Sequence, residues 1–303
     1  MRENAPSVEG LLRRAWYALF RHHPYYYAGA LQWAAMRGDE TQRLRRAFEL
    51  FRREPLALRT LALRVYIDKL YYDRHSNAAA VPGPNRLRWT EPLGTDYHEE
   101  LLRHYQARPE EFERDHAPIL ARTRELLREA AFEYVVEVGC GNGLLMERLA
   151  EHGAAAGTTF VGLDISAETI ERTRQRWPGS RVQYHCCDTL QDFLGRVRPT
   201  STLILANGTV QHFTQRELSG CLQWLVENVA RGAVVVKDFT YPDGRLESQS
   251  RPAGGFSFYH NYEYLLAEAG LRDIRTQVYE ARPTWKGVVV SARWGREARG
   301  GAV

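Results

Sequence analysis

The chain has 303 residues with 44% hydrophobic content, enough for a buried core and for one large or two modest domains. No apolar run approaches the roughly 18 residues that span a bilayer, and the N-terminus lacks the pattern of a secretory signal, so we expect a soluble, cytoplasmic protein. The four cysteines form no C-x-x-C pair, which argues against a disulfide framework or a structural zinc.

The net charge of +4 is unevenly distributed along the chain. Residues 1–90 carry 16 Lys and Arg against 8 Asp and Glu, which leaves 25 against 29 for the remainder. A basic region of this kind can meet a nucleic acid or an acidic substrate, although solvated helix faces are the commoner explanation. Only three of the 41 basic residues are lysines, a bias typical of a GC-rich bacterium.

The N-terminal part is predicted to be helical. Apolar and aromatic residues recur at helical spacing from position 8 to about position 74. Breaks are expected at Pro24, at Asp39 and at Pro55, and Asp39 is suited to cap the helix that follows it. The aromatic residues, among them Trp33, are too numerous for solvent exposure, so we expect a helical core or a homodimer contact, with an aromatic substrate pocket as the alternative.

A stretch rich in Pro, Gly and Asn follows at 77–94 and is expected to be a linker or loop. We place the domain boundary there, which gives an N-terminal helical cap, substrate-binding or dimerisation domain over 1–95 and a second domain over 96–303. Helical spacing resumes at 96–105 and again at 109–131.

From position 134 the hydrophobic period changes. Short apolar runs now alternate with helix-length amphipathic segments, the pattern of a mostly parallel α/β sheet with helices on both faces. Because only a short segment with Arg282-Pro283-Thr284 separates the last two strands, a parallel crossover is too long to fit, and we expect an antiparallel hairpin at one edge of the sheet. The predicted strands are 134–138, 159–163, 181–185, 201–206, 232–237, 271–279 and 285–294.

Three alternating glycines connect the first of these strands to the helix predicted at 144–152, in the segment Glu137-Val-Gly-Cys-Gly-Asn-Gly143. Glycine lets the backbone turn tightly and approach a ligand, and open α/β sheets bind ligands at the carboxyl ends of their strands. The spacing is G-x-G-x-G and lacks the G-x-x-G step of the dinucleotide fingerprint, which argues against NAD.

Acidic residues end the next two strands. Asp164 lies 21 residues after Gly143, where a carboxylate can accept hydrogen bonds from both hydroxyls of a ribose. The alternative is a helix cap, although Ser166 with Glu168 could supply that cap instead. Asp188 is similarly placed to accept from an adenine amino group, or to serve as a turn or capping residue.

Taken in order, these motifs resemble the cofactor motifs of Rossmann-like (class I) S-adenosylmethionine-dependent methyltransferases over roughly residues 110–295. The resemblance implies a seven-stranded sheet of order 3-2-1-4-5-7-6 with the seventh strand antiparallel. It also implies that Glu137 and the glycine backbone surround the methionine part of the cofactor, that Asp164 holds the ribose, and that Asp188 with Thr189 faces the adenine. The cofactor-binding residues implied in this way are Glu137, Gly139, Cys140, Gly141, Asn142, Gly143, Asp164, Ile165, Asp188, Thr189, Asn207 and Gly208, the last two bordering the transferred methyl group.

Candidate catalytic residues are fewer. His212 is a candidate general base because a neutral imidazole titrates near working pH, although the family often has histidine at this place for packing. Asp238, Tyr259 and His260 share the ligand-bearing rim and could touch the substrate, with ordinary loop packing as the alternative. No carboxylate and histidine spacing indicates a metal site.

We therefore predict an S-adenosylmethionine-dependent methyltransferase that acts on oxygen or nitrogen of a small molecule in bacterial specialised metabolism, with Tyr97 and Tyr105 helping to close over the cofactor. One alternative is an RNA or protein methyltransferase that docks its substrate on the basic N-terminal helices. Another is a non-catalytic Rossmann-like binding subunit. The exit of the fourth strand lacks the Asn/Asp-Pro-Pro-aromatic signature of enzymes that methylate nucleobase amino groups, so we do not expect a nucleic acid partner.

Overall fold

The computed structural model describes eight stretches of the chain, and these divide into two compact units. One unit comprises Met1–Leu93 and Pro252–Ser257, and the other comprises Gly94–Arg251 and Phe258–Val303. Within the described stretches, no helix is both long enough and apolar enough to cross a membrane. The described residues are 24–54, 57–75, 89–90, 92–151, 157–240, 248–254, 257–282 and 285–295.

The N-terminal unit contains the helices α2 (Pro24–Ala35), α3 (Glu40–Arg53) and α4 (Leu58–His75). The break predicted before α3 is confirmed, because Asp39 caps that helix and its side chain accepts a hydrogen bond from the backbone N–H of Gln42. The Gln42 side chain in turn accepts from the Asp39 backbone, which completes a capping box.

These three helices enclose a small apolar core. A Cβ added at Gly29 of α2 would lie 2.2 Å from the Ala62 carbonyl oxygen of α4, so a glycine is needed where these two helices approach. Trp33 is 7% exposed and belongs to the core, as the aromatic content predicts, whereas Tyr27 is 52% exposed. The buried core residues are Trp33, Leu44, Ala47, Phe48, Leu63 and Ile67.

The predicted linker at 77–94 falls largely on residues 76–88, which lie outside the described residues. Its last part is helical instead, since α6 begins at Pro92 and extends over Pro92–Ala107. Proline suits the first turn of a helix, where its missing N–H would have no helical partner.

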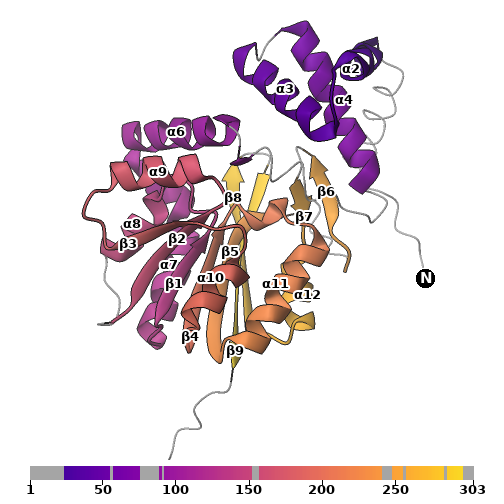
Figure 1. Cartoon of the computed structure of the whole chain (residues 1–303). Coiled ribbons are helices and arrows are strands. Elements are labelled where there is room, and N and C mark those ends of the chain that lie inside the picture. Colours follow the sequence, from indigo (N-terminus) through magenta and orange to yellow (C-terminus); the bar gives the residue numbers. More distant parts are fainter. Residues whose placement is uncertain are drawn as a thin grey trace, which may run out of the picture. The chain divides into compact units, whose positions relative to one another are not determined.

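The second unit is built on a seven-stranded sheet of order β3-β2-β1-β4-β5-β9-β8 (Figure 1). Strands β1 to β5 are parallel, and β9 runs antiparallel to both β5 and β8. Counted along the chain, the sheet strands follow the predicted order 3-2-1-4-5-7-6, and the predicted edge hairpin is confirmed. The strands are β1 (Tyr134–Val138), β2 (Thr159–Asp164), β3 (Val182–Cys186), β4 (Ser201–Asn207), β5 (Arg231–Phe239), β8 (Arg272–Arg282) and β9 (Trp285–Gly295).

Two short strands that the sequence does not predict, β6 (Arg251–Gly254) and β7 (Ser257–Tyr259), form a separate two-stranded sheet. Strands of three or four residues are too short for hydrophobic alternation to reveal them.

Helices cover both faces of the seven-stranded sheet (Figure 1). One face packs on α7 and α8, and the other packs on α10, α11 and α12. Besides α6, the helices of this unit are α7 (Pro109–Glu129), α8 (Leu144–Glu151), α9 (Ala167–Arg176), α10 (Leu190–Val197), the short 3₁₀ helix η1 (Val210–His212), α11 (Gln215–Asn228) and α12 (Tyr262–Glu268).

The alternation of side chains along each strand decides which residues face α7. Val135, Leu205 and Val235 enter the core on the α7 and α8 side. Since successive side chains point to opposite faces of a sheet, Asn207 and Lys237 lie on that same face, two positions further toward the carboxyl ends of β4 and β5. The polar ends of these strands therefore meet at one rim of the sheet.

Candidate active site

The turn between β1 and α8 has a left-handed backbone at each of its glycines. The φ angles are +71° at Gly139, +50° at Gly141 and +78° at Gly143, a region that residues with a Cβ rarely adopt. The turn is also tied to the neighbouring strand, because the N–H groups of Gly139 and Cys140 both donate to the Leu163 carbonyl oxygen at 2.8 Å.

Protein side chains lie directly against all three glycines. Close packing is therefore a second reason for glycine at these positions, beside the approach of a ligand that the sequence suggests. A Cβ at any of the three positions would come closer than 3.0 Å to a neighbouring side chain, which real Cβ atoms essentially never do. The nearest atoms are Thr209 Oγ1 at 2.3 Å for Gly139, His98 Nδ1 at 2.5 Å for Gly141, and the Tyr184 hydroxyl at 2.5 Å for Gly143.

Asp164, at the end of β2, contacts this glycine turn. One carboxylate oxygen accepts the Gly141 N–H at 3.1 Å, and the other accepts the Ser166 N–H at 2.9 Å. The cap of α9 is Ser166, whose hydroxyl accepts the Thr169 N–H at 3.1 Å. Since a carboxylate can accept about four hydrogen bonds, the buried Asp164 keeps acceptor capacity for the hydroxyls of a ligand.

Glu137, near the end of β1, is only 2% exposed. Among the described residues, its Oε2 has no hydrogen-bond partner. Burial raises the pKa of this carboxyl well above its ordinary value, and the negative charge of Asp164 adds to the effect. An orphaned buried acceptor is costly, and an ammonium such as that of a methionine moiety would satisfy it, so the residues fit S-adenosylmethionine.

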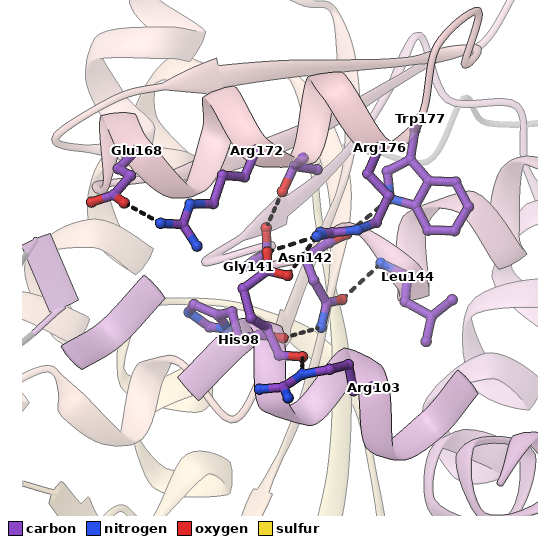
Figure 2. Close-up of polar contacts among 11 residues, drawn as sticks. His98, Arg103, Gly141, Asn142, Leu144, Glu168, Arg172, Arg176 and Trp177 are labelled. Atoms are coloured by element: carbon purple, nitrogen blue, oxygen red, sulfur yellow. Dashed lines mark hydrogen bonds and ion pairs between the residues drawn. The ribbon is translucent and has the colours of Figure 1, made fainter. Parts of the chain in front are cut away.

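Helix α6 lies directly on the turn (Figure 2). The Asn142 side-chain amide donates to the His98 carbonyl oxygen at 3.1 Å, and the Asn142 backbone carbonyl oxygen accepts the Trp177 indole N–H at 2.9 Å. The guanidinium of Arg176 on α9 pairs with Glu99 at 2.6 Å. These contacts place α6 against both the glycine turn and α9, and they use the Asn142 side chain to hold the α6 backbone.

The sequence assigns the closing role on α6 to Tyr97 and Tyr105, and this assignment stays a prediction. Tyr97 is 50% exposed, and Tyr105 packs on the ring of His116 with centroids 5.3 Å apart. It is His98 that lies on the turn, and burial lowers the pKa of its imidazole. A shift of one residue turns a helical side chain by about a quarter of a turn, and the apolar periodicity of this segment is too weak to fix that angle.

The remaining cofactor candidates near β2 and β3 differ in exposure. Asp188 is exposed after β3, and the Thr189 hydroxyl caps α10 by accepting an N–H from its first turn. Ile165 is half-buried. Cys140 is buried, which raises the pKa of its thiol. The adenine and ribose roles of this group stay predictions.

At the end of β4 the side chain of Asn207 meets a lysine. Lys237 Nζ donates to Asn207 Oδ1 at 3.0 Å, and the Gly208 N–H donates to the Lys237 carbonyl oxygen at 2.8 Å. The φ of Gly208 is +71°. Asn207 and Gly208 thus lie one strand away from the glycine turn, at the same rim of the sheet.

Asp238 lies on the opposite face of the sheet from Lys237. Its carboxylate accepts the Tyr262 hydroxyl at 2.8 Å and the N–H groups of Gln211 at 3.0 Å and Phe239 at 2.8 Å. Burial raises the pKa of Asp238 to about 7. Three donors from the protein occupy this carboxylate, a geometry that favours a structural role over the predicted substrate contact.

His260 is also engaged on both ring nitrogens. Nδ1 lies 2.6 Å from the Ser250 hydroxyl and Nε2 lies 3.2 Å from the Val210 carbonyl oxygen, which places the ring proton on Nε2. Burial lowers the pKa of His260 to about 4, so the ring is neutral. His212 and Tyr259 are half-buried, and their catalytic assignments stay predictions.

The hydrogen bond between Tyr262 and Asp238 predicts that Tyr262→Phe lowers the stability by an amount that depends on pH. Because the pKa of Asp238 is raised to about 7, the folded protein keeps a proton from about pH 4 to 7 that the unfolded chain has released, and this group's contribution to stability falls as the pH rises. Above pH 7 the carboxylate is ionised and the tyrosine bond is charge-assisted, so the variant should lose about 1.5 to 3 kcal/mol there and less at about pH 5. Urea unfolding at both pH values measures the difference.

Tyr264→Phe is the matched control, because its hydroxyl donates to Glu268 at 3.1 Å on the exposed side of the same helix. It should cost less than about 1 kcal/mol at either pH. An equal loss for Tyr262→Phe at both pH values would contradict the ionisation of Asp238 near pH 7.

Sequence reasoning missed His98, His116 and Lys237. Lys237 follows the apolar run 233–236 within β5 and is one of three lysines in the chain, a signal that could have found it. His116 is buried on α7 and carries no sequence signal. In the part of the chain that the structure describes, no group of three or more His, Cys, Asp or Glu residues is placed to hold a metal ion.

Comparison with known protein families identifies a match over residues 135–232, to the family described as "Methyltransferase domain". The match spans the glycine turn, Asp164, Asp188 and the strands from β1 to the beginning of β5. None of the curated proteins matches the chain.

Solved structures with similar folds include three methyltransferases of low sequence identity. The 1,6-didemethyltoxoflavin-N1-methyltransferase of Burkholderia thailandensis is 18% identical, with a TM-score of 0.46 over 66% of this chain and 88% of that one. The N-methyltransferase NodS of Bradyrhizobium japonicum WM9 is 18% identical, with a TM-score of 0.45 over 61% and 97%. The magnesium protoporphyrin IX methyltransferase of Synechocystis PCC 6803 is 17% identical, with a TM-score of 0.42 over 60% and 82%.

Proposed function

We propose that this chain, of which residues 135–232 match the family described as "Methyltransferase domain", is a class I S-adenosylmethionine-dependent methyltransferase that methylates oxygen or nitrogen of a small molecule. The observation that carries the proposal is the contact between the buried Asp164 carboxylate and the Gly141 N–H, beside the orphaned oxygen of Glu137. Acceptors for ribose hydroxyls and for a methionine ammonium are thereby held at one turn. The turn lies at the carboxyl end of β1, where open α/β sheets bind their ligands.

The residues of this turn act by positioning. S-adenosylmethionine supplies a methyl group on a sulfonium, which a nucleophile displaces in line. Such a reaction depends mainly on alignment and on exclusion of water. Asp164 and Glu137 would hold the two ends of the cofactor, and Asn207 with Gly208 would border the methyl group at the end of β4.

The position of α6 supports a small acceptor. The His98 ring lies against Gly141, and the Asn142 amide is bonded to the α6 backbone. A helix on the turn shields this side from water and leaves less open surface for a large substrate than a bare rim would. The N-terminal domain, placed by us at residues 1–95, would bind substrate or form a homodimer, and the arginine-rich composition supports a bacterial specialised pathway.

The second candidate is an RNA or protein methyltransferase, and it is favoured by the excess of basic residues in positions 1–90, 16 against 8. The two functions differ in the class of molecule that receives the methyl group. We would incubate the protein with S-[methyl-³H]adenosylmethionine and a cell extract divided by ultrafiltration. Label in a filtrate compound that separates from S-adenosylmethionine by chromatography and is absent without the protein supports a small acceptor, and transferred label confined to retained RNA or protein would refute it.

Calorimetry with S-adenosylhomocysteine tests the cofactor assignment separately. We expect saturable binding at one site per chain. A protein that binds neither this product nor S-adenosylmethionine would be a non-catalytic Rossmann-like subunit.

His212→Ala tests general base catalysis. If the His212 imidazole removes a proton from the acceptor, turnover should fall about 100-fold, whereas the dissociation constant of S-adenosylhomocysteine should change less than about twofold. Turnover is measured with the acceptor found in the filtrate. Normal turnover of the variant would assign His212 to packing of η1 (Val210–His212).

A further inference from the structure

Lys237 is an unusual group for the rim of this sheet. Its ammonium is only partly exposed, and burial lowers its pKa. Within the described residues, Lys237 forms no ion pair, and its single hydrogen bond goes to the neutral Asn207 Oδ1 at 3.0 Å. An ammonium carries three donors, and a desolvated cation without a direct ion-pair partner is costly, so this site has spare donors on a cation that no carboxylate contacts among the described residues.

The Asn207 amide adds a second donor beside it. A lysine ammonium can only donate, so the Asn207 oxygen must face Lys237 and the amide nitrogen must point away. In the described part of the chain, that nitrogen has no hydrogen-bond partner, and it is not among the buried atoms that lack one. Donors from two adjacent strands therefore reach the same accessible rim.

The groups that face Lys237 from α7 do not neutralise it. Asp115 exerts a Coulombic attraction on Lys237, but it pairs with Arg114 at 3.1 Å and accepts the Tyr105 hydroxyl at 3.4 Å. His116 holds its Nδ1 2.9 Å from the Phe112 carbonyl oxygen. Burial, with Lys237 as a lesser cause, lowers the pKa of His116 to about 4, so its ring is neutral.

The other neighbouring carboxylate, that of Asp238, also attracts Lys237 Coulombically but forms no ion pair with it among the described residues. Asp238 is adjacent in sequence, but it lies on the other face of the sheet, where Tyr262 and two backbone N–H groups occupy it. The Lys237 ammonium thus has no ion-pair partner in the described part of the chain, and it lies on the α7 face, next to the end of β4 where the methyl group would be presented.

We propose that Lys237 and the Asn207 amide form an anion-binding subsite that holds a carboxylate or phenolate oxygen of the methyl acceptor. The inference rests on the proposed function and narrows it, because it makes the acceptor an acidic small molecule. Lys237 is a specificity-determining residue in this scheme. Two neighbouring donors at the same rim, one of them charged, match an anionic oxygen better than a neutral carbonyl or an ammonium.

The small number of lysines makes the subsite directly observable. Labelling with [ε-¹³C]lysine gives three signals, from Lys69, Lys237 and Lys286, which Lys→Met variants assign. The probe is sodium acetate, added to protein saturated with S-adenosylhomocysteine, with sodium chloride and acetamide as controls. We expect acetate to move the Lys237 signal saturably and to raise the pKa of Lys237 by about one unit. The exposed Lys286 should respond equally weakly to acetate and chloride.

Lys237→Met keeps the length and apolar stem of the side chain while removing the charge, and Lys286→Met is its matched control. Both variants should bind S-adenosylhomocysteine as the wild type does. In one outcome the wild type binds S-adenosylhomocysteine, but acetate does not move the Lys237 signal, or moves it no more than chloride does. That result would refute the anion subsite alone. A wild-type protein that does not bind S-adenosylhomocysteine would refute the proposed function and this inference with it.

Discussion

Asp164→Ala is expected to weaken binding of S-adenosylhomocysteine by about 2 to 4 kcal/mol, or roughly 30- to 1000-fold in the dissociation constant. The substitution would remove the acceptor proposed for both ribose hydroxyls. It would also leave the N–H groups of Gly141 and Ser166 without the carboxylate that accepts them at 3.1 and 2.9 Å. The turn would then lose its fixed position, so the two effects should act in the same direction. Calorimetry of wild type and variant measures the loss.

Ser166→Ala is the matched control for this experiment. The Ser166 hydroxyl caps α9 by accepting the Thr169 N–H at 3.1 Å, and its loss should cost about 1 kcal/mol of unfolding free energy. It leaves the Asp164 carboxylate and the glycine turn in place, so cofactor affinity should change little. An unchanged dissociation constant for Asp164→Ala, or an equal loss for Ser166→Ala, would contradict the ribose assignment.

The sheet could be predicted from the sequence because its determinants are local. Short apolar runs at regular intervals mark the strands, and the short connection before β9 allows only an antiparallel hairpin. The cap at Asp39 and the order of the glycine turn and Asp164 likewise follow from residues that are close together in sequence. The contact between Gly141 and Asp164 then follows from the parallel pairing of β1 with β2.

The face of the sheet on which each rim residue lies could not be predicted in the same way. In β5 the residues Val234, Val235 and Val236 are all buried, because helices cover both faces of the sheet. A strand that is apolar on both faces carries no alternation, so the sequence does not tell which side Lys237 and Asp238 each take. The structure places Asp238 among hydrogen-bond donors near α12 and Lys237 on the α7 face. The sequence indicates Asp238, and not Lys237, as the candidate for substrate contact.

The contacts of α6 depend on tertiary packing as well. Tyr97 and Tyr105 attract attention by their chemistry, yet the residue against the turn is His98. Its neighbours there, Asn142 and Gly141, are more than 40 positions away in sequence. A contact of this range has no signature within any local window of residues.

Gly141→Ala is expected to destabilise the fold and to abolish detectable binding of S-adenosylhomocysteine. The φ of Gly141 is +50°, and the added Cβ would lie 2.5 Å from His98 Nδ1. The left-handed backbone alone costs a residue with a Cβ about 1 to 2 kcal/mol, and displacement of α6 or of the turn should bring the loss of unfolding free energy to about 3 kcal/mol or more. A displaced turn would also carry the Gly141 N–H away from Asp164. Urea unfolding and calorimetry measure the two effects.

Two further variants separate backbone strain from the contact with α6. Gly179 has a φ of +74° and nothing within 4 Å of the Cβ position, so Gly179→Ala should cost only the backbone term and leave cofactor binding intact. In Gly141→Ala combined with His98→Ala the ring is gone, and the loss relative to His98→Ala alone should fall to about that of Gly179→Ala. Since cavity and strain effects couple only between neighbours, a double variant that recovers no stability would mean that α6 does not lie on the turn. Recovery of stability without recovery of binding would show instead that the methyl group itself occupies space the cofactor needs.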